Sequence, residues 1–198
     1  CLTVLLLAGL AGTAAAPGRA AGTGGVPSLD HAFIIILENH AYGQIIGNPV
    51  APYINRMARS YNLATHYRAV THPSLPNYLA LVAGRYFGIH SDDYPAWGGK
   101  GGGLFSRRIT PLDGPTLGDQ LSAAGLTWRV YAEDLPPGGA YGVDVSPGGT
   151  GGALYAVKHN PFMYFASVQH SRALLATSVP GTQLGQDLDA GKAPSVSF

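Results

Sequence analysis

A run of six apolar residues, Ala32 to Leu37, leads directly into Glu38, Asn39 and His40. A continuous apolar run rich in branched side chains predicts a strand that is buried on both faces, as in the centre of a parallel sheet. Polar groups at the C-terminal end of such a strand lie where open α/β sheets place their sites. The run therefore predicts an α/β fold with a site that begins at Glu38.

The rest of the chain alternates between helical and extended patterns. Alternation of this kind predicts a parallel sheet covered by helices on both faces. We expect helices at 51–61, 74–83, 116–124 and 182–190, and strands at 32–37, 63–70, 127–132 and from 194 onward.

Bulk composition narrows the class of protein. The 198 residues suffice for one good core, and a formal charge of +1 without a large basic cluster argues against nucleic-acid binding as the main role. The single cysteine, Cys1, excludes an internal disulfide and a cysteine-based metal site.

The N-terminal residues predict export. We interpret residues 1–21 as the remnant of a signal peptide, 22–30 as a small-residue linker and 31–198 as one folded domain. The apolar stretch is shorter than the roughly 20 residues that a membrane-spanning helix needs, so we expect no stable transmembrane anchor and a secreted or extracytoplasmic protein. A lipid anchor on Cys1 is the alternative.

The segment from Thr71 to Tyr78 places the hydroxyl of Ser74 between two prolines, where a helix should begin. Gly84 is a suitable end for that helix. Free backbone N–H groups and the helix dipole attract anions to such an N-terminus, so the segment indicates phosphate transfer with Ser74 as the nucleophile. The alternative is that Ser74 only caps the helix.

Glu38 and Asn39 supply hard oxygen donors, which suit a divalent metal ion of unknown identity. An ion bound by Glu38, Asn39 and Ser74 would lower the pKa of the serine hydroxyl. The alternative interpretation of the Glu38–Asn39 pair is a turn with a solvated carboxylate. Asp92 and Asp93 are interpreted as a solvated acidic loop, and the alternative is that they contact the metal or the substrate entrance.

Three blocks of residues together resemble one known group. They are residues 36–42, the segment 71–78 with Ala83 and Gly84, and Tyr155 with residues 158–162. These blocks resemble the phosphoesterases of the alkaline-phosphatase superfamily, in the branch of bacterial secreted acid phosphatases, phosphatidylinositol phosphatases and phospholipases C. The resemblance implies that residues 31–198 are a phosphoesterase domain, a three-layer α/β/α sandwich with a mostly parallel central sheet, in a secreted bacterial protein.

The resemblance also implies roles for single residues. Ser74 would attack phosphorus and form a phosphoryl-enzyme intermediate, and Asn77 would donate a hydrogen bond to the phosphate. Lys158 and His159 would bind phosphate or protonate the leaving group, although His159 is equally interpreted as an ordinary half-buried histidine. The family completes its metal site with aspartates after a strand that would begin near Ser195, so we expect further ligands beyond Phe198 and a domain truncated at its C-terminus.

The sequence thus predicts a secreted, metal-dependent phosphomonoesterase of the acid phosphatase type. Its expected substrates are phosphate esters, and phospholipid headgroups such as phosphoinositides are candidates. Two alternatives stay open. One is a phosphodiesterase of the phospholipase C type, and the other is an exported fragment that binds anions without turnover. A serine esterase is disfavoured because no Gly-x-Ser-x-Gly motif surrounds Ser74.

Overall fold

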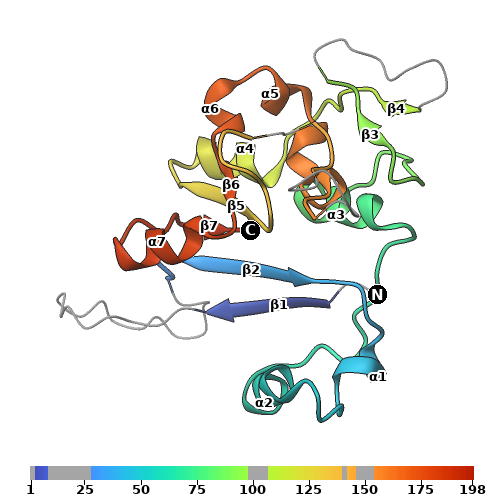
Figure 1. Ribbon diagram of the computed structural model, residues 1–198, viewed down its shortest axis with the longest axis vertical. Helices are drawn as coiled ribbons and strands as arrows, with labels where there is room; N and C mark the ends of the chain where they lie inside the picture. The colour runs from blue at the N-terminus through green and yellow to red at the C-terminus, as the bar shows by residue number, and fades with distance from the viewer. Residues whose placement is uncertain (1–2, 9–27, 98–106, 140–141, 146–153) are drawn as a thin grey trace.

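The computed structural model describes residues 3–8, 28–97, 107–139, 142–145 and 154–198. Within these residues, a five-stranded sheet has the order β1-β2-β7-β5-β6, and β3 pairs with β4 in a small second sheet (Figure 1). The strands are β1 (Thr3–Ala8), β2 (Ala32–Leu37), β3 (Tyr94–Pro95), β4 (Arg108–Ile109), β5 (Trp128–Ala132), β6 (Ser178–Pro180) and β7 (Val196–Ser197).

Short helices connect and cover these strands. The α-helices are α1 (Tyr42–Ile45), α2 (Pro52–Ser60), α3 (Ser74–Ala83), α4 (Leu117–Ala123), α5 (Ala166–Gln169), α6 (Arg172–Leu175) and α7 (Gln183–Asp189). Two 3₁₀ turns, η1 (Val157–His159) and η2 (Pro161–Tyr164), precede α5. None of the helices in the described ranges is long and apolar enough to cross a bilayer.

The main sheet is mostly parallel. Strand β7 lies between β2 and β5 and runs parallel to both, and β6 runs parallel to β5. Only β1 is antiparallel, pairing with β2 along its whole length. The predicted α/β fold with a mostly parallel central sheet is confirmed, and it is consistent with an α/β/α sandwich of the alkaline-phosphatase type. The proposed signal-peptide remnant and linker lie largely outside the described residues.

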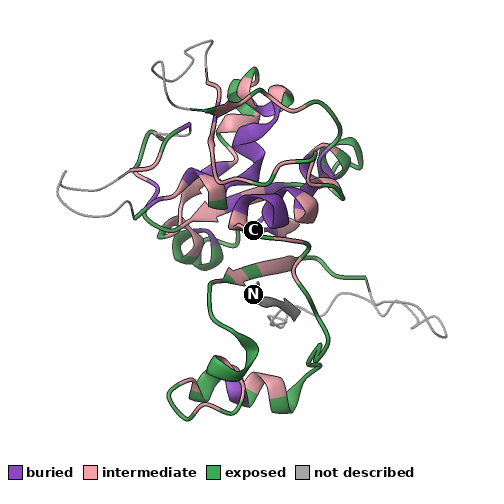
Figure 2. Cartoon of the chain, turned by 90° about the vertical axis from the view of Figure 1, so that its right-hand side faces the viewer, coloured by how far each residue is buried: buried purple, intermediate pink, exposed green. Residues whose placement is uncertain are grey.

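Two details of the prediction are wrong. Strand β2 is not buried on both faces, because Ile35 is 40% and Leu37 is 52% exposed. Residues 63–70 form no strand. The side chains of this segment are exposed, Leu63 and Val70 among them, and no strand of the described chain pairs with it (Figure 2). Apolar residues alone are therefore not enough to form a strand here.

Helix α3 forms the centre of the core. Its residues Leu75, Leu79 and Val82 are buried at helical spacing and pack with the fully buried residues of η2. The helix ends as predicted, at Gly84, whose positive φ of 69° is a conformation that glycine adopts without strain. The core therefore holds fixed the helix that begins at Ser74.

A buried carboxylate fastens α7 to the sheet. Asp187 is 4% exposed and accepts hydrogen bonds from the Tyr131 hydroxyl at 2.7 Å and from Gln183 at 3.0 Å, and it pairs with Arg129. The hydrogen bond from Tyr131 is the main cause that lowers the pKa of Asp187; burial opposes it, and Gln183 and Arg129 add to the lowering. Burial and the hydrogen bond to Asp187 raise the pKa of Tyr131 to about 12, so this hydroxyl keeps its proton.

We expect Asp187→Asn to lower the free energy of unfolding by about 3 kcal/mol at pH 7, because it leaves buried donors without a charged partner. The folded-state pKa of Asp187 lies below the unfolded value of about 3.9, so this stabilisation is present above about pH 4 and is lost as the pH falls below it. Urea denaturation between pH 7 and pH 3.5 measures the difference.

The matched control is Asp189→Asn, an exposed carboxylate on the same helix. We expect it to change the free energy of unfolding by less than about 0.5 kcal/mol. A loss for Asp187→Asn that stays the same at both ends of the pH range would contradict the assigned role of the charge.

Candidate active site

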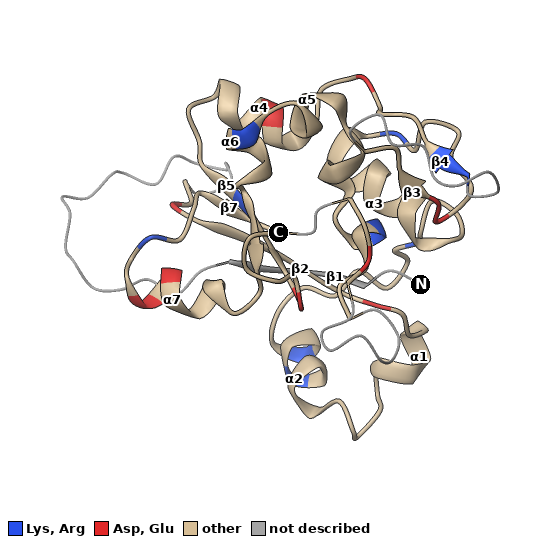
Figure 3. Cartoon of the chain, turned by 45° about the horizontal axis from the view of Figure 1, so that its top comes forward, with Lys and Arg blue, Asp and Glu red and all other residues tan. Residues whose placement is uncertain are grey.

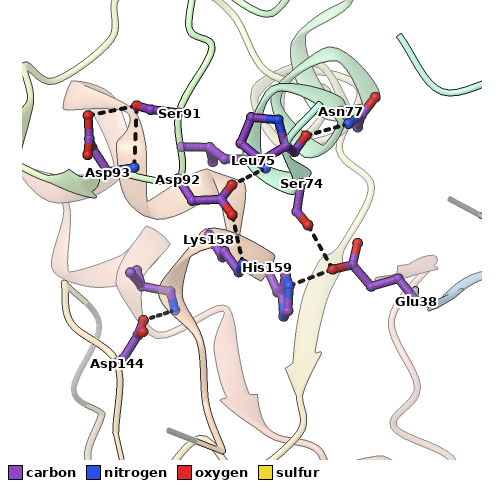
Figure 4. A network of polar contacts seen from close by, with 12 residues as sticks. Glu38, Ser74, Leu75, Asn77, Ser91, Asp92, Asp93, Asp144, Lys158 and His159 are labelled. Atoms are coloured by element: carbon purple, nitrogen blue, oxygen red, sulfur yellow. Dashed lines mark hydrogen bonds and ion pairs between the residues drawn. The ribbon is translucent and has the colours of Figure 1, made fainter. Parts of the chain in front are cut away.

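Three side chains from separate elements meet at one carboxylate. The Ser74 hydroxyl, at the start of α3, donates a hydrogen bond to Glu38 Oε1 at 2.9 Å. His159 Nε2, at the end of η1, lies 2.8 Å from the same oxygen (Figure 4). The structure therefore brings together Ser74, Glu38 and His159, which the sequence placed in one site from three distant blocks.

Glu38 remains ionised in this setting. Burial raises its pKa, but the hydrogen bond and charge of His159, together with the Ser74 hydroxyl and Lys158, outweigh burial, so the pKa of Glu38 lies below its ordinary value. Tyr78 also reaches this carboxylate: burial first, then the charge of Glu38 and a hydrogen bond to it, raise the pKa of the tyrosine hydroxyl. The site thus centres on a negative charge that several donors surround.

A second carboxylate connects the same elements from the other side. Asp92 accepts a hydrogen bond from the Leu75 N–H at 2.9 Å and pairs with Lys158 Nζ at 2.7 Å. Because Leu75 follows Ser74 and Lys158 precedes His159, the contacts close a ring that runs through both carboxylates (Figure 4). We call Ser74, Glu38, His159, Lys158, Asp92 and Leu75 the active-site ring.

The N-terminus of α3 offers fewer free donors than we expected from its sequence. An α-helix normally leaves its first N–H groups unpaired. Here Pro73 and Pro76 have no N–H, and the Leu75 N–H is bound to Asp92. The first turn therefore has fewer backbone N–H groups available for an anion than a typical helix.

The predicted phosphate donor Asn77 is buried and already engaged. Its Nδ2 donates to the carbonyls of Thr71 at 2.7 Å and Pro73 at 2.8 Å, and its Oδ1 accepts from the backbone N–H groups of Val70 and Thr71. In this structure Asn77 therefore holds the segment before Ser74 against α3, and its amide hydrogens do not point to a substrate.

The proposed metal ligands fit an open site and not a closed cage. Glu38 and Ser74 present a carboxylate and a hydroxyl oxygen side by side, and Asn39 is exposed next to them. The described residues contain no group of three or more His, Cys, Asp or Glu side chains that could hold a metal. Mg²⁺ is commonly bound by one or two carboxylates, with waters and phosphate oxygens completing its coordination. The donors present fit that mode.

A cavity of about 540 Å³ adjoins the site. Glu38, Tyr78 and His159 lie on its wall, and most of the remaining wall is apolar side chains of β2, β5 and η2. Glu133 also lines it, whereas Asp134 is exposed outside it. The active-site ring therefore lies at the edge of a largely apolar cavity.

Sequence reasoning missed two members of this arrangement. Tyr78 could have been identified from the sequence, because it lies four residues after Ser74 and therefore on the same face of α3. Asp92, interpreted as a solvated acid, binds two groups of the ring. Its contacts depend on a partner 66 residues away, so no local pattern marks it.

Comparison with known proteins supports the resemblance to phosphoesterases. The chain is 36% identical over 197 residues to the phosphatidylinositol-3-phosphatase of Mycobacterium tuberculosis, covering 100% of this chain and 57% of that protein. It is 31% identical over 166 residues to a Kluyveromyces lactis protein named "Probable acid phosphatase", covering 84% of this chain and 36% of that protein. It is 32% identical over 136 residues to an Aspergillus fumigatus acid phosphatase, covering 69% of this chain and 28% of that protein.

The chain therefore spans 57% or less of the length of these three relatives. The sequence profile of the phosphoesterase family matches residues 48–198, which include Ser74, Asp92 and His159. With the matched region and the relatives in agreement, this chain belongs to the phosphoesterase family.

Proposed function

We propose that the protein is an exported, metal-dependent phosphomonoesterase with Ser74 as its nucleophile. The hydrogen bond from the Ser74 hydroxyl to Glu38, at the start of a helix fixed in the core, carries this proposal. Relatives named as phosphatases support a phosphate ester as the substrate. The arrangement suits a hydroxyl that must be oriented by a neighbouring base before it attacks phosphorus.

In the first step, Ser74 Oγ attacks phosphorus. The new Oγ–P bond forms while the bond from phosphorus to the leaving alcohol oxygen breaks, and the serine proton passes to Glu38. His159, which contacts the same Glu38 oxygen, is placed to deliver a proton to the departing alcohol. In the second step, water attacks the phosphoserine and gives one proton to His159, which lost its own in the first step. The Oγ–P bond breaks, and the proton held by Glu38 returns to Ser74 Oγ as inorganic phosphate leaves.

We assign Glu38, Asn39 and Ser74 as the donors that this chain gives to a divalent metal. Such an ion would supply positive charge that lowers the pKa of the serine hydroxyl and offsets the charge of the phosphate. Glu38 stays ionised because its pKa is lowered, so it can serve as a donor over a wide range of pH. Waters and substrate oxygens would complete the coordination.

Substrate contacts fall to the positive side of the ring. We assign His159 and the Ser74 N–H to the phosphate, with Lys158 adding positive charge from its place beside Asp92. Asn77 acts indirectly by holding the segment 70–73 in front of the nucleophile. The rival function is anion binding without turnover, which the small number of acidic metal donors in the described residues favours.

Ser74→Ala is expected to lower the release of phosphate from an aryl phosphomonoester at least about a thousandfold. The other hydroxyl at Glu38, that of Tyr78, cannot replace it, because burial and the Glu38 carboxylate raise its pKa and keep it protonated. The assay uses the 198-residue chain with Mg²⁺ or Mn²⁺ and again with a chelator, which should abolish the release. Acid quenching during turnover, followed by peptide mass analysis, should place a phosphoryl group on Ser74.

Ser91→Ala is the matched control, since that hydroxyl bonds to Asp93 outside the ring and should be dispensable for turnover. Release that persists in Ser74→Ala, or that is unaffected by the chelator, would contradict the nucleophile or the metal. Phosphate binding without any turnover would favour the rival function.

Asp92→Asn should lower kcat about tenfold or more with little change in the melting temperature. The variant keeps an oxygen for the Leu75 N–H but loses the charge that holds Lys158, so the segment carrying His159 is no longer fixed relative to Ser74. Steady-state kinetics and thermal denaturation measure the two effects.

Asp93→Asn is the control, because this neighbouring carboxylate bonds to Ser91 and not to the ring. Combining Asp92→Asn with Lys158→Met tests the pair directly: if the two residues act together, the double variant loses little beyond the worse single variant. Fully additive losses would show that Asp92 acts independently of Lys158.

A further inference from the structure

The chain between Glu38 and Ser74 forms a separate exposed arm. We define the arm as residues 40–72, which include α1 and α2. Figure 1 shows both helices set apart from the other helices, beyond β2, and Figure 2 shows that they are mostly exposed. Asn55 is the only buried residue of the arm. The arm therefore has almost no apolar core of its own.

Polar bonds hold the arm in shape. Asn55 accepts a hydrogen bond from the Gly47 N–H at 2.6 Å, and its Nδ2 donates to the carbonyls of Ile45, Asn48 and Ala51. These contacts fasten the turn between α1 and α2 from the inside. Because one amide satisfies this backbone, the apolar side chains of the arm are free to face outward.

The outward-facing side chains are unusually apolar. Seven of the fourteen large apolar side chains that are exposed in the described residues belong to this arm of 33 residues. A concentration of exposed apolar side chains in one segment is the kind of feature that marks an interaction site. The seven are Tyr42, Val50, Tyr53, Tyr61, Leu63, Tyr67 and Val70.

The charge of the arm has one sign. It contains Arg56, Arg59 and Arg68 and no aspartate or glutamate, although the whole chain is nearly neutral. All three arginines are exposed, and Figure 3 shows basic positions on α2. The guanidinium of Arg56 lies 5.2 Å from the ring centre of Tyr53, so cationic and aromatic groups share one surface.

We propose that this arm docks on an anionic lipid surface. Tyrosine and arginine both suit a bilayer interface, because each places an apolar body among the lipids and a polar end in the headgroup region. Arginines near a membrane surface are attracted by anionic lipids. A second copy of the arm is a poorer partner, since it would bring like charges together without an acidic residue to pair them.

Docking would bring the lipid surface to the active site. The arm begins two residues after Glu38 and ends two residues before Ser74, so both of its ends lie next to the residues that share the central hydrogen bond. If the proposed phosphatase activity holds, a phospholipid headgroup is then a substrate class that suits this location. The docking itself does not depend on turnover.

The experiment measures binding of the 198-residue chain to vesicles by sedimentation, without a substrate. Vesicles of phosphatidylcholine with about one third phosphatidylserine should bind the chain, and pure phosphatidylcholine should bind it at least tenfold more weakly. Raising the salt to 0.5 M should weaken binding, because the attraction is screened. Removing the three arginines together, in Arg56→Gln, Arg59→Gln, Arg68→Gln, should weaken binding about a hundredfold.

Two control variants distinguish an effect of the arm from an effect of the overall charge or hydrophobicity of the chain. The triple variant Arg107→Gln, Arg172→Gln, Lys192→Gln removes the same charge from exposed positions outside the arm and should leave binding within about threefold of wild type. Tyr53→Ser with Tyr61→Ser should weaken binding about tenfold, whereas Leu126→Ser with Leu188→Ser, at similarly exposed sites elsewhere, should not.

Three results would overturn the proposal: no binding to anionic vesicles, an equal loss in both charge variants, or an equal loss in both apolar variants. A molecular mass that rises with concentration in the absence of lipid, and that falls in the tyrosine variant, would assign the arm to self-association instead. Failure of the phosphatase assay with intact vesicle binding would overturn the proposed function and leave the docking surface standing.

Discussion

The Glu38 carboxylate is the contact on which the site depends. It directly follows β2, accepts a hydrogen bond from the hydroxyl of Ser74 in α3, and contacts His159 in η1. A partly buried carboxylate is stable only when donors surround it, so its presence fixes the relative positions of a strand, a helix and a 3₁₀ turn that are far apart in sequence. Asp92 repeats this pattern between Leu75 and Lys158, which makes the arrangement a closed ring instead of a chain of contacts.

Much of the fold could be predicted from sequence because its signals are local. Helix α3 has a glycine that ends it and an apolar face at helical spacing, and the expected helices near α2, α4 and α7 and the strand β5 lie within a few residues of their predicted bounds. Ser74 and Glu38 each follow a recognisable pattern, a helix start and a strand end. Local patterns place residues on elements, and the parallel sheet then brings the ends of those elements together.

The errors share a cause, which is dependence on distant partners. The apolar residues of β2 predict burial, but burial needs a covering layer, and Ile35 and Leu37 remain exposed in the described chain. The segment 63–70 has strand-forming residues but no neighbouring strand. Asp92 and Asp93 look alike in sequence, yet only Asp92 reaches Lys158, because a salt bridge across 66 residues depends on the completed fold.

Asn77 connects the arm to the start of α3 at Ser74. Its side chain bonds to the backbone of Val70 and Thr71 at the end of the arm and to Pro73 just before Ser74, while Asn77 itself lies in the first turns of α3. A buried amide with all these bonds satisfied transmits a displacement instead of absorbing it, because breaking any one of them leaves a polar group unpaired. The hydrogen bonds of Asn77 therefore fix the end of the arm relative to Ser74, so a displacement of the arm bears directly on the position of that residue.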